Sequence, residues 1–372
     1  MKPDDQRACC IRQAEKVEGG YIWGRGTWDD KGNLIAQMEA VEALLQAGFQ
    51  PRRGVVLIYG HDEETGGLKG AAVVAQAFKQ RGLRLEFVID EGLVVTQGIV
   101  PGITPPAALV GLAEKGSAWV RISAQADGGH ASMPPVQGGS AIGLLSAAMA
   151  RLDAHPMPGG LKGAAAELFS TLAPEMPFGQ RLVLGNLWLT RPLVENMLSG
   201  APSTNAMLRT TAALTMFHAG NKENVLPGKA DAVVDFRLLP GDSVDDAVAH
   251  ARRVIADERI TVQATPDVNP ASRLSSSTSR GYKSIEQAAR DVFAGALVAP
   301  GLMLGGTDAR HFDDLADDVY RFSPVRAGPD DLARLHGTNE RLSVQNFTEM
   351  IRFYHRLLQL AAGDSRNEGK QP

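Results

Sequence analysis

Apolar and polar positions follow two different patterns along this chain, and the first pattern covers the opening hundred residues. Residues 54–60 (GVVLIYG) and 87–90 (FVID) are continuous apolar runs of the kind that forms buried strands. Apolar residues recur at helical spacing over residues 34–45, with Gly48 placed to end that helix, and again over residues 66–81. Strands that alternate with helices predict an α/β fold with a mostly parallel central sheet, in which ligands bind at the carboxyl ends of the strands.

The second pattern begins after Pro106 and alternates apolar with polar side chains. Residues 118–126 and 230–239 alternate in this way, which predicts strands with one face in solvent. Between them we expect a helix near residues 140–152, followed by a long irregular region rich in proline, glycine and methionine. A serine cluster at residues 272–279 is typical of a linker. Two further helices are expected near the end of the chain, over residues 285–293 and 347–360.

These patterns predict one α/β domain that is interrupted by an insertion. The outer domain is expected to contain residues 1–112 and 270–372, and the α+β insertion to contain residues 113–269. The only cysteines, Cys9 and Cys10, are too few for a disulfide framework. A net charge of −4 without a long basic run gives no reason to expect nucleic acid or a membrane as a partner. With no signal peptide or membrane span visible, a cytoplasmic location is the default expectation, and the compartment is otherwise unknown.

Three acidic sites follow predicted strands or glycine-rich turns. They are Asp29-Asp30 in GRGTWDDKG, Asp62-Glu63-Glu64 after GVVLIYGH, and Asp90-Glu91 in VIDEG. Each of them alone could cap a helix and favour its dipole. Carboxylates that converge at one edge of a sheet repel each other unless a cation lies among them, and carboxylate oxygens are good ligands for such a cation.

Two of the eight histidines lie in polar turns of the kind that displays functional groups. His336 belongs to LHGTNER, and His130 belongs to DGGHAS at the end of an alternating strand. The other histidines are expected on the surface or in packing positions. Together with the acidic sites, these residues predict a metal-dependent enzyme.

The complete set of motifs resembles the dizinc metallopeptidase family that includes glutamate carboxypeptidase, aminoacylase and carboxypeptidase S. The GTDARHF and HGTNER pieces are most similar to the carboxypeptidase S group. The matching pieces occur in the order of the family and span roughly residues 20 to 355: YIWGRGTWDDKGN, LIYGHDEETGG, VIDEG, DGGHAS, NVLPGKADAVVDFRLLPG, GGTDARHF and HGTNERLSV.

The resemblance implies a role for five residues around the metals. Asp29 matches the carboxylate that bridges two zinc ions. Glu64 and His336 match ligands of one zinc, and Glu91 matches a ligand of the other. Glu63 matches the general base. The implied activity is zinc-dependent hydrolysis of an amide bond in a peptide or an N-acyl amino acid.

The resemblance also implies how the substrate is held. His130 matches a histidine that the insertion, acting as a lid and dimerisation domain, offers to the substrate carbonyl across a dimer interface. Asn224, Arg237 and Arg310 match positions that hold the carboxylate or carbonyl of the substrate, for which the arginine fork is well shaped. A homodimer is therefore expected.

One part of the family pattern is absent from this sequence. The family has a His-x-Asp motif upstream of the bridging aspartate, whereas no histidine precedes Asp29 here. The match begins only near Lys16 or Val17, as expected of a truncated or altered N-terminus. We therefore expect one well-formed zinc site and a second site with only Asp29 and Glu91, because zinc normally takes three or four protein ligands. An impaired homologue that binds carboxylates or dimerises without turnover is the alternative. A nucleotide-binding protein is disfavoured, because the aspartates of GRGTWDDKG would repel phosphate.

Overall fold

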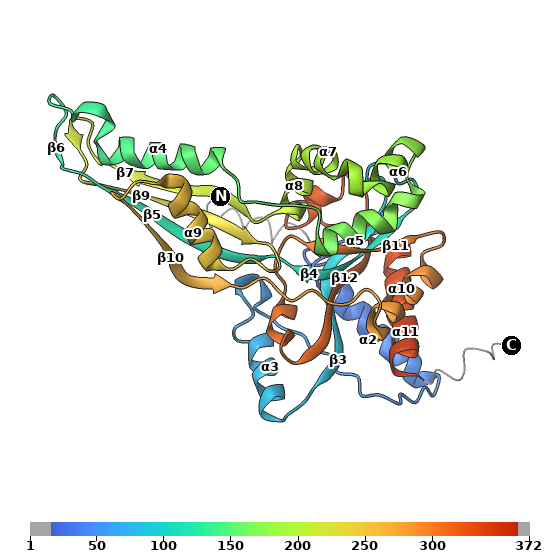
Figure 1. Cartoon of the computed structure of the whole chain (residues 1–372). Helices are drawn as coiled ribbons and strands as arrows, with labels where there is room; N and C mark the ends of the chain where they lie inside the picture. The colour runs from blue at the N-terminus through green and yellow to red at the C-terminus, as the bar shows by residue number, and fades with distance from the viewer. Residues whose placement is uncertain (1–15, 364–372) are drawn as a thin grey trace.

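Two separate β-sheets form the framework of the molecule, and they extend from a common centre (Figure 1). The computed structural model describes residues 16–363, so Cys9, Cys10 and the segment before Lys16 lie outside the described residues. No helix within 16–363 has the length and hydropathy that a bilayer span requires.

The first sheet has the strand order β11-β4-β12-β3. Its two long ladders, β11 with β4 and β12 with β3, are parallel, and only short pairings of β4 with β12 and β3 are antiparallel. The predicted α/β fold with a mostly parallel central sheet is therefore confirmed. The strands are Leu85–Thr96 (β3), Ala107–Glu114 (β4), Leu297–Met303 (β11) and Ala316–Ala327 (β12).

Helices cover both faces of this sheet. Helices α2, α10 and α11 pack beside one another and bury Ala36, Ile285 and Phe353 against the strands (Figure 1). Helix α3 packs against the segment that contains Phe312 and Leu315, and its Phe78 ring contacts that of Phe312. The predicted helices are thereby confirmed, with the bounds Lys31–Gln46 (α2), Ala71–Gln80 (α3), Arg280–Val292 (α10) and Val344–Ala362 (α11).

The second sheet is antiparallel and has the order β10-β5-β9-β7. Buried and more exposed residues alternate along β5 and β9, as their apolar and polar residues predict. Helices α4 and α9 cover one face, and the serines Ser140 and Ser243 cap them by accepting from backbone N–H groups. The elements are Gly116–Gln125 (β5), Ala141–Ala154 (α4), Thr211–Ala219 (β7), Lys229–Leu238 (β9), Val244–Ile255 (α9) and Ile260–Asn269 (β10).

The remaining strands of the described chain form two small sheets. The first, β1-β2-β13, joins the beginning of the described chain to its last third, and the second, β6-β8, lies at the outer end of the antiparallel sheet (Figure 1). Their strands are Lys16–Glu18 (β1), Tyr21–Trp23 (β2), Gly129–His130 (β6), Val225–Leu226 (β8) and Arg341–Ser343 (β13). The short 3-10 helices are Glu63–Thr65 (η1), Val136–Gly138 (η2), Ala173–Glu175 (η3), Asp308–Phe312 (η4) and Leu332–Arg334 (η5).

Two predictions for the first hundred residues are wrong. Residues 54–60 do not form a strand and are mostly exposed, because no described strand lies beside them to bond their backbone groups. In α2 the predicted apolar face is only partly buried, since Leu44 is buried whereas Ile35 and Met38 are exposed. The small residues Ala36 and Ala40 are buried instead, because α2 packs closely against α11.

The region after α4, which was expected to be irregular, contains four helices and strand β7. Helix α5 packs on the first sheet, where Leu168 and Leu172 contact Ile103 and Ala107. Part of the predicted insertion therefore lies against the outer domain, and the boundaries at residues 113 and 269 stay a prediction. The helices are Gly163–Leu172 (α5), Phe178–Gly185 (α6), Leu187–Ser199 (α7) and Pro202–Leu208 (α8).

The chain crosses between the two sheets at Glu114, Lys115 and Gly116. A Cβ atom on Gly116 would lie 2.4 Å from the backbone N of Ala271, so only glycine fits where the returning chain crosses. Lys115 is buried, and its Nζ donates to the carbonyl oxygens of Ala206 and Arg209 at 2.9 Å each. Burial lowers the pKa of this lysine to about 8.

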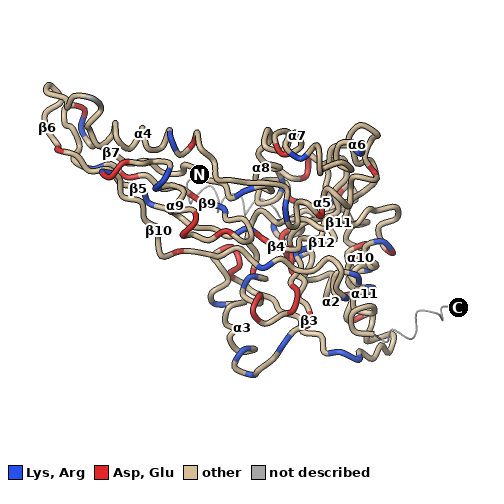
Figure 2. The backbone as a smooth tube through the Cα atoms, in the orientation of Figure 1, with Lys and Arg blue, Asp and Glu red and all other residues tan. Residues whose placement is uncertain are grey.

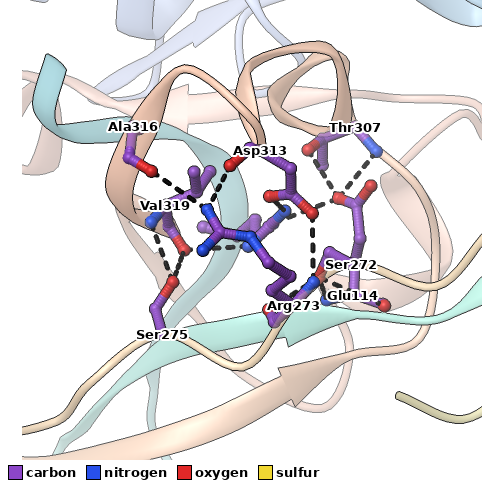
Figure 3. Close-up of polar contacts among 9 residues, drawn as sticks. Glu114, Ser272, Arg273, Ser275, Thr307, Asp313, Ala316 and Val319 are labelled. Carbon is purple, nitrogen blue, oxygen red and sulfur yellow. Dashed lines mark hydrogen bonds and ion pairs between the residues drawn. The ribbon is translucent and has the colours of Figure 1, made fainter. Parts of the chain in front are cut away.

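A buried ion pair fixes the same crossing from the other side (Figure 3). Glu114 accepts from Arg321 Nε at 3.1 Å and from the backbone N and Oγ1 of Thr307 at 3.1 and 2.8 Å. Ser272 Oγ accepts from the Glu114 backbone N, so the serine segment predicted as a linker has no helix or strand but is held in place. Because Thr307 directly precedes η4, the ion pair also positions that helix.

Removing Glu114 should leave the fully buried Arg321 guanidinium with only the longer ion pair to Asp313, at 3.6 Å. We expect Glu114→Ala to lower the free energy of unfolding by about 3–5 kcal/mol. The exposed ion pair of Arg84 with Asp317 offers a control, because Asp317→Ala should cost less than about 1 kcal/mol. Urea unfolding followed by circular dichroism measures both variants, and equal losses would contradict a stabilising role for Glu114.

Candidate metal centre

Strands β2 and β13 bring together two loops that are far apart in the sequence. Trp23 pairs with Arg341, and the backbone N of Gly24 donates to the carbonyl oxygen of Glu340 at 3.2 Å. The loop of residues 24–30, which contains Asp29, therefore lies against the turn of residues 336–340, which contains His336.

The side chain of Glu340 holds the two loops in register. Its Oε1 accepts from the backbone N–H groups of Gly26, Trp28 and Asp29 at 2.9, 2.9 and 3.2 Å. Its Oε2 accepts from Arg25 Nη1 at 2.6 Å, and the carboxylate is fully buried. Glu340 belongs to the HGTNER motif, but the sequence predicts no role for it. The only sign of it in the sequence is an acidic residue four positions after the predicted ligand His336.

The first cluster of possible metal ligands contains Asp29, Glu64 and His336. One donor atom from each lies within 4.8 Å of the others. His336 Nε2 is 2.6 Å from Asp29 Oδ2 and 3.2 Å from Glu64 Oε1. Burial would lower the pKa of His336, but its hydrogen bond with Asp29 and the charge of Glu64 raise it overall. These are the three residues that the sequence predicted for one zinc ion.

The second cluster contains Asp29, Asp30 and Glu91, whose donor atoms also lie within 4.8 Å of one another. The sequence predicted Asp29 and Glu91 here but not Asp30, although the pair Asp29-Asp30 had been noticed. Burial, the hydrogen bond with Asp29 and the charges of Asp30 and Asp29 raise the pKa of Glu91 to about 11. Burial likewise raises the pKa of Asp30 well above its usual range.

The donor chemistry of the two clusters differs. An imidazole nitrogen and two carboxylates are three ligands of types that zinc binds, the number that catalytic zinc sites take from the protein, so the first cluster fits this metal. The second cluster supplies carboxylate oxygens alone, a set that suits harder cations better than zinc. The residues that the structure describes thus offer one cluster with a nitrogen donor and one cluster of carboxylates alone.

Glu63 lies next to the first cluster, in η1, and its environment suits proton transfer. Burial, together with the negative charges of Asp308 and Glu64, raises the pKa of Glu63 to about 7, although Arg310 opposes this shift. Helix η4 supplies both Asp308 and Arg310, and it is held against η1 by a 3.0 Å hydrogen bond between His311 Nε2 and the carbonyl oxygen of Gly66.

The remaining predicted residues lie apart from this group in a single chain. His130 and Asn224 belong to the β6 and β8 region, where the backbone N of Ala131 donates to the Asn224 carbonyl at 3.1 Å. Figure 1 places this region at the outer end of the second sheet, far from η1. Arg237 lies on β9 and pairs with Asp235 at 3.2 Å. One chain therefore brings Arg310, but neither His130 nor Asn224, to the candidate centre.

Comparison with known proteins agrees with this geometry. The model of Peptidase family M20/M25/M40 matches residues 4–360. The N-fatty-acyl-amino acid synthase/hydrolase PM20D1 of Xenopus tropicalis is 41% identical over 93% of this chain and 67% of its own length. The probable carboxypeptidase S-like 2 of Dictyostelium discoideum is 39% identical over 92% of this chain and 66% of its own length. The chain thus spans about two thirds of the length of these relatives.

A solved structure shares the fold at low sequence identity. The M20 family metallo-carboxypeptidase Sso-CP2 from Sulfolobus solfataricus has a TM-score of 0.63 and 19% identity, and the match covers 94% of this chain and 80% of that one. The resemblance found in the motifs is confirmed by these matches. The chain belongs to Peptidase family M20/M25/M40.

Proposed function

We propose that this protein is a zinc-dependent hydrolase that cleaves the amide bond of a peptide or an N-acyl amino acid and releases an amino acid. The observation that carries the proposal is the convergence of Asp29, Glu64 and His336, whose donor atoms lie within 4.8 Å of one another beside Glu63. Relatives named as an N-fatty-acyl-amino acid hydrolase and a carboxypeptidase support it, because both substrates have an amide linked to an amino acid.

Asp29, Glu64 and His336 would hold one zinc ion tightly. Asp29, Asp30 and Glu91 would hold a second cation weakly, because this cluster lacks a nitrogen ligand. Bound zinc supplies a Lewis acid that polarises the scissile carbonyl and lowers the pKa of water.

Glu63 acts as the general base and then as the general acid. Its carboxylate takes a proton from the attacking water and delivers that proton to the nitrogen of the departing amine. A pKa near 7 suits both steps, since the group can be ionised before attack and protonated after it. Positioned proton transfer of this kind contributes about 10² to 10⁴ in rate.

Arg310 binds the carboxylate of the substrate. Its positive charge lies close enough to Glu63 to oppose the rise in the pKa of that carboxyl, so the guanidinium lies beside the metal ligands. The guanidinium would bind the free α-carboxylate of an amino acid product. An arginine in this place favours substrates that end in a carboxylate.

A second copy of the chain completes the site in this proposal. His130 and Asn224 are too remote to act within their own chain, and the 113–269 segment would carry them, with Arg237, to the centre of the partner as a lid and dimerisation domain. His130 would then donate a hydrogen bond to the oxyanion that forms at the scissile carbonyl.

Replacing Glu63 by glutamine should remove the proton acceptor and leave the size of the side chain nearly unchanged. We expect Glu63→Gln to lower kcat at least 100-fold for N-acyl amino acids and dipeptides, with zinc affinity retained. Release of free amine from a mixed substrate panel measures the effect. Equal turnover by both proteins would refute the role of Glu63. No turnover by the unchanged chain, when it is folded and zinc-loaded, would favour the impaired homologue.

Replacing Glu340 should loosen the loop that presents Asp29. We expect Glu340→Gln to weaken binding of the tight zinc ion by about 10- to 100-fold, the usual cost of losing a group that orients a metal ligand. Competition with a chromophoric chelator measures this affinity without turnover. Glu349→Gln is the control, because Glu349 is paired with Arg326 at 2.7 Å and does not contact the loop of residues 24–30. Equal affinities in the two variants would overturn this role.

The proposed partner contribution can be tested by mixing two inactive variants. We expect His130→Ala and Glu63→Gln to be weak enzymes separately. After exchange of subunits, the mixed dimer has one site with both native residues, so the mixture should recover about a quarter of the native activity. Failure to recover activity, with subunit exchange verified by two affinity tags, would show that His130 does not act across an interface.

A further inference from the structure

Helices α6 and α7 carry large apolar side chains on their outer surface. Leu189, Leu193 and Met197 recur every four residues along α7 and are 67%, 55% and 67% exposed, and Trp188 beside them is 83% exposed. Phe178 and Leu182 form a matching pair on α6. We call these six side chains the outer apolar surface. Figure 2 shows the two helices at one edge of the molecule, mostly without charged positions.

The outer apolar surface is not needed to hold the two helices in place. Their inner side chains already pack: Val194 is buried against Leu161 and Leu208, with Val183 and Leu198 at the margin of the same cluster. A helix that is apolar on both sides is normally buried on both sides, in the core of a protein or in a membrane. Exposed apolar patches of this kind mark interaction sites.

The charges of the two helices favour an anionic partner. Within residues 178–199 the charged side chains are Arg181, Arg191 and Glu195, and Glu195 already accepts from the backbone N of Leu161 at 2.8 Å. Neither guanidinium has a hydrogen-bond or ion-pair partner within residues 16–363, and both are exposed. Arg181 lies three residues after Phe178, on the same side of α6.

We propose that the outer apolar surface binds an anionic lipid bilayer peripherally, with Trp188 and Phe178 in the headgroup region and the two arginines against lipid phosphates. Aromatic and leucine side chains flanked by arginine are the composition of helices that lie in the plane of a membrane interface. A second copy of the chain fits less well, because a two-fold contact between these helices would bring four arginines into one interface, and the only acidic side chain of residues 178–199, that of Glu195, is already bonded to Leu161.

The net charge of the whole chain, −4, does not predict contact with an anionic bilayer. It depends on a local surface rather than on the sum of charges. If the chain hydrolyses N-acyl amino acids, docking would also bring the enzyme to substrates with long acyl chains, which partition into membranes. That consequence rests on the proposed function, whereas lipid binding is measured without turnover and can fail separately.

Vesicle flotation of the full chain tests the proposal. One set of vesicles contains phosphatidylcholine alone, and the other also contains about 30% phosphatidylglycerol, which gives the surface a negative potential. We expect binding to the anionic vesicles that the double substitution Leu189→Gln with Leu193→Gln weakens more than tenfold. Arg181→Gln and Arg191→Gln should each weaken it about fivefold, and added salt should have the same effect. Trp188 emission should shift to the blue on binding, and Trp188→Phe should abolish that shift while most binding remains.

The matched control is Met133→Gln with Val136→Gln, two exposed apolar residues outside α6 and α7. This variant should bind vesicles as the unchanged chain does. Circular dichroism checks that each variant keeps its fold, and light scattering measures whether each variant is a monomer or a dimer. The proposal is overturned if the unchanged chain ignores anionic vesicles, if the control loses binding equally, or if the leucine substitutions turn a dimer into a monomer, since a second copy would then cover this surface.

Discussion

A buried carboxylate, that of Glu340, joins the loop of Asp29 to the turn of His336. The two segments are more than 300 residues apart, and the ladder of β2 and β13, only three residue pairs long, would align their backbones only approximately. Three backbone N–H groups and one guanidinium converge on this one side chain. Because a buried carboxylate is costly unless its hydrogen bonds are complete, the loop and the turn are held in the one arrangement that satisfies it. The distance between Asp29 and His336 follows from that arrangement.

The crossing between the two sheets is the second point on which the site depends. Glu114 bonds to Arg321 and to Thr307 (Figure 3). Lys115, the next residue, donates instead to the carbonyl oxygens of Ala206 and Arg209 at the end of α8. The same residue pair therefore fixes η4, which presents Arg310, and the start of β5, which leads toward the region of His130. In the proposed mechanism Arg310 serves the site of its own chain and His130 the site of the partner, so this junction helps to position groups of two sites.

Two regions of the molecule expose apolar side chains, and only one of them, residues 54–60, adjoins the candidate metal ligands. The segment of residues 54–60 leads directly into Asp62, Glu63 and Glu64, and it lacks a neighbouring strand among the described elements. Glu64 is therefore positioned by the contact of η1 with η4 rather than by a strand, whereas the loops of Asp29 and His336 are joined by Glu340. The α6–α7 surface, in contrast, is carried by helices that are already packed on their inner side. Its exposure leaves the interior complete, which is the property expected of a docking surface.

The sequence by itself determined the α/β class and most long elements, because helical and alternating periodicities reflect which side of an element is buried. Its motifs determined the family, and the resemblance to that family implied the roles of Asp29, Glu64 and His336. It did not determine that residues 54–60 stay unpaired or that Ala36, rather than Ile35, is the buried residue of α2. An apolar residue reports only a preference for burial, and the neighbour that buries it lies elsewhere in the chain. Tertiary structure alone decided the roles of Glu340 and Asp30 and the separation of His130 from the centre, because these depend on which distant backbone groups and side chains face each carboxylate or imidazole.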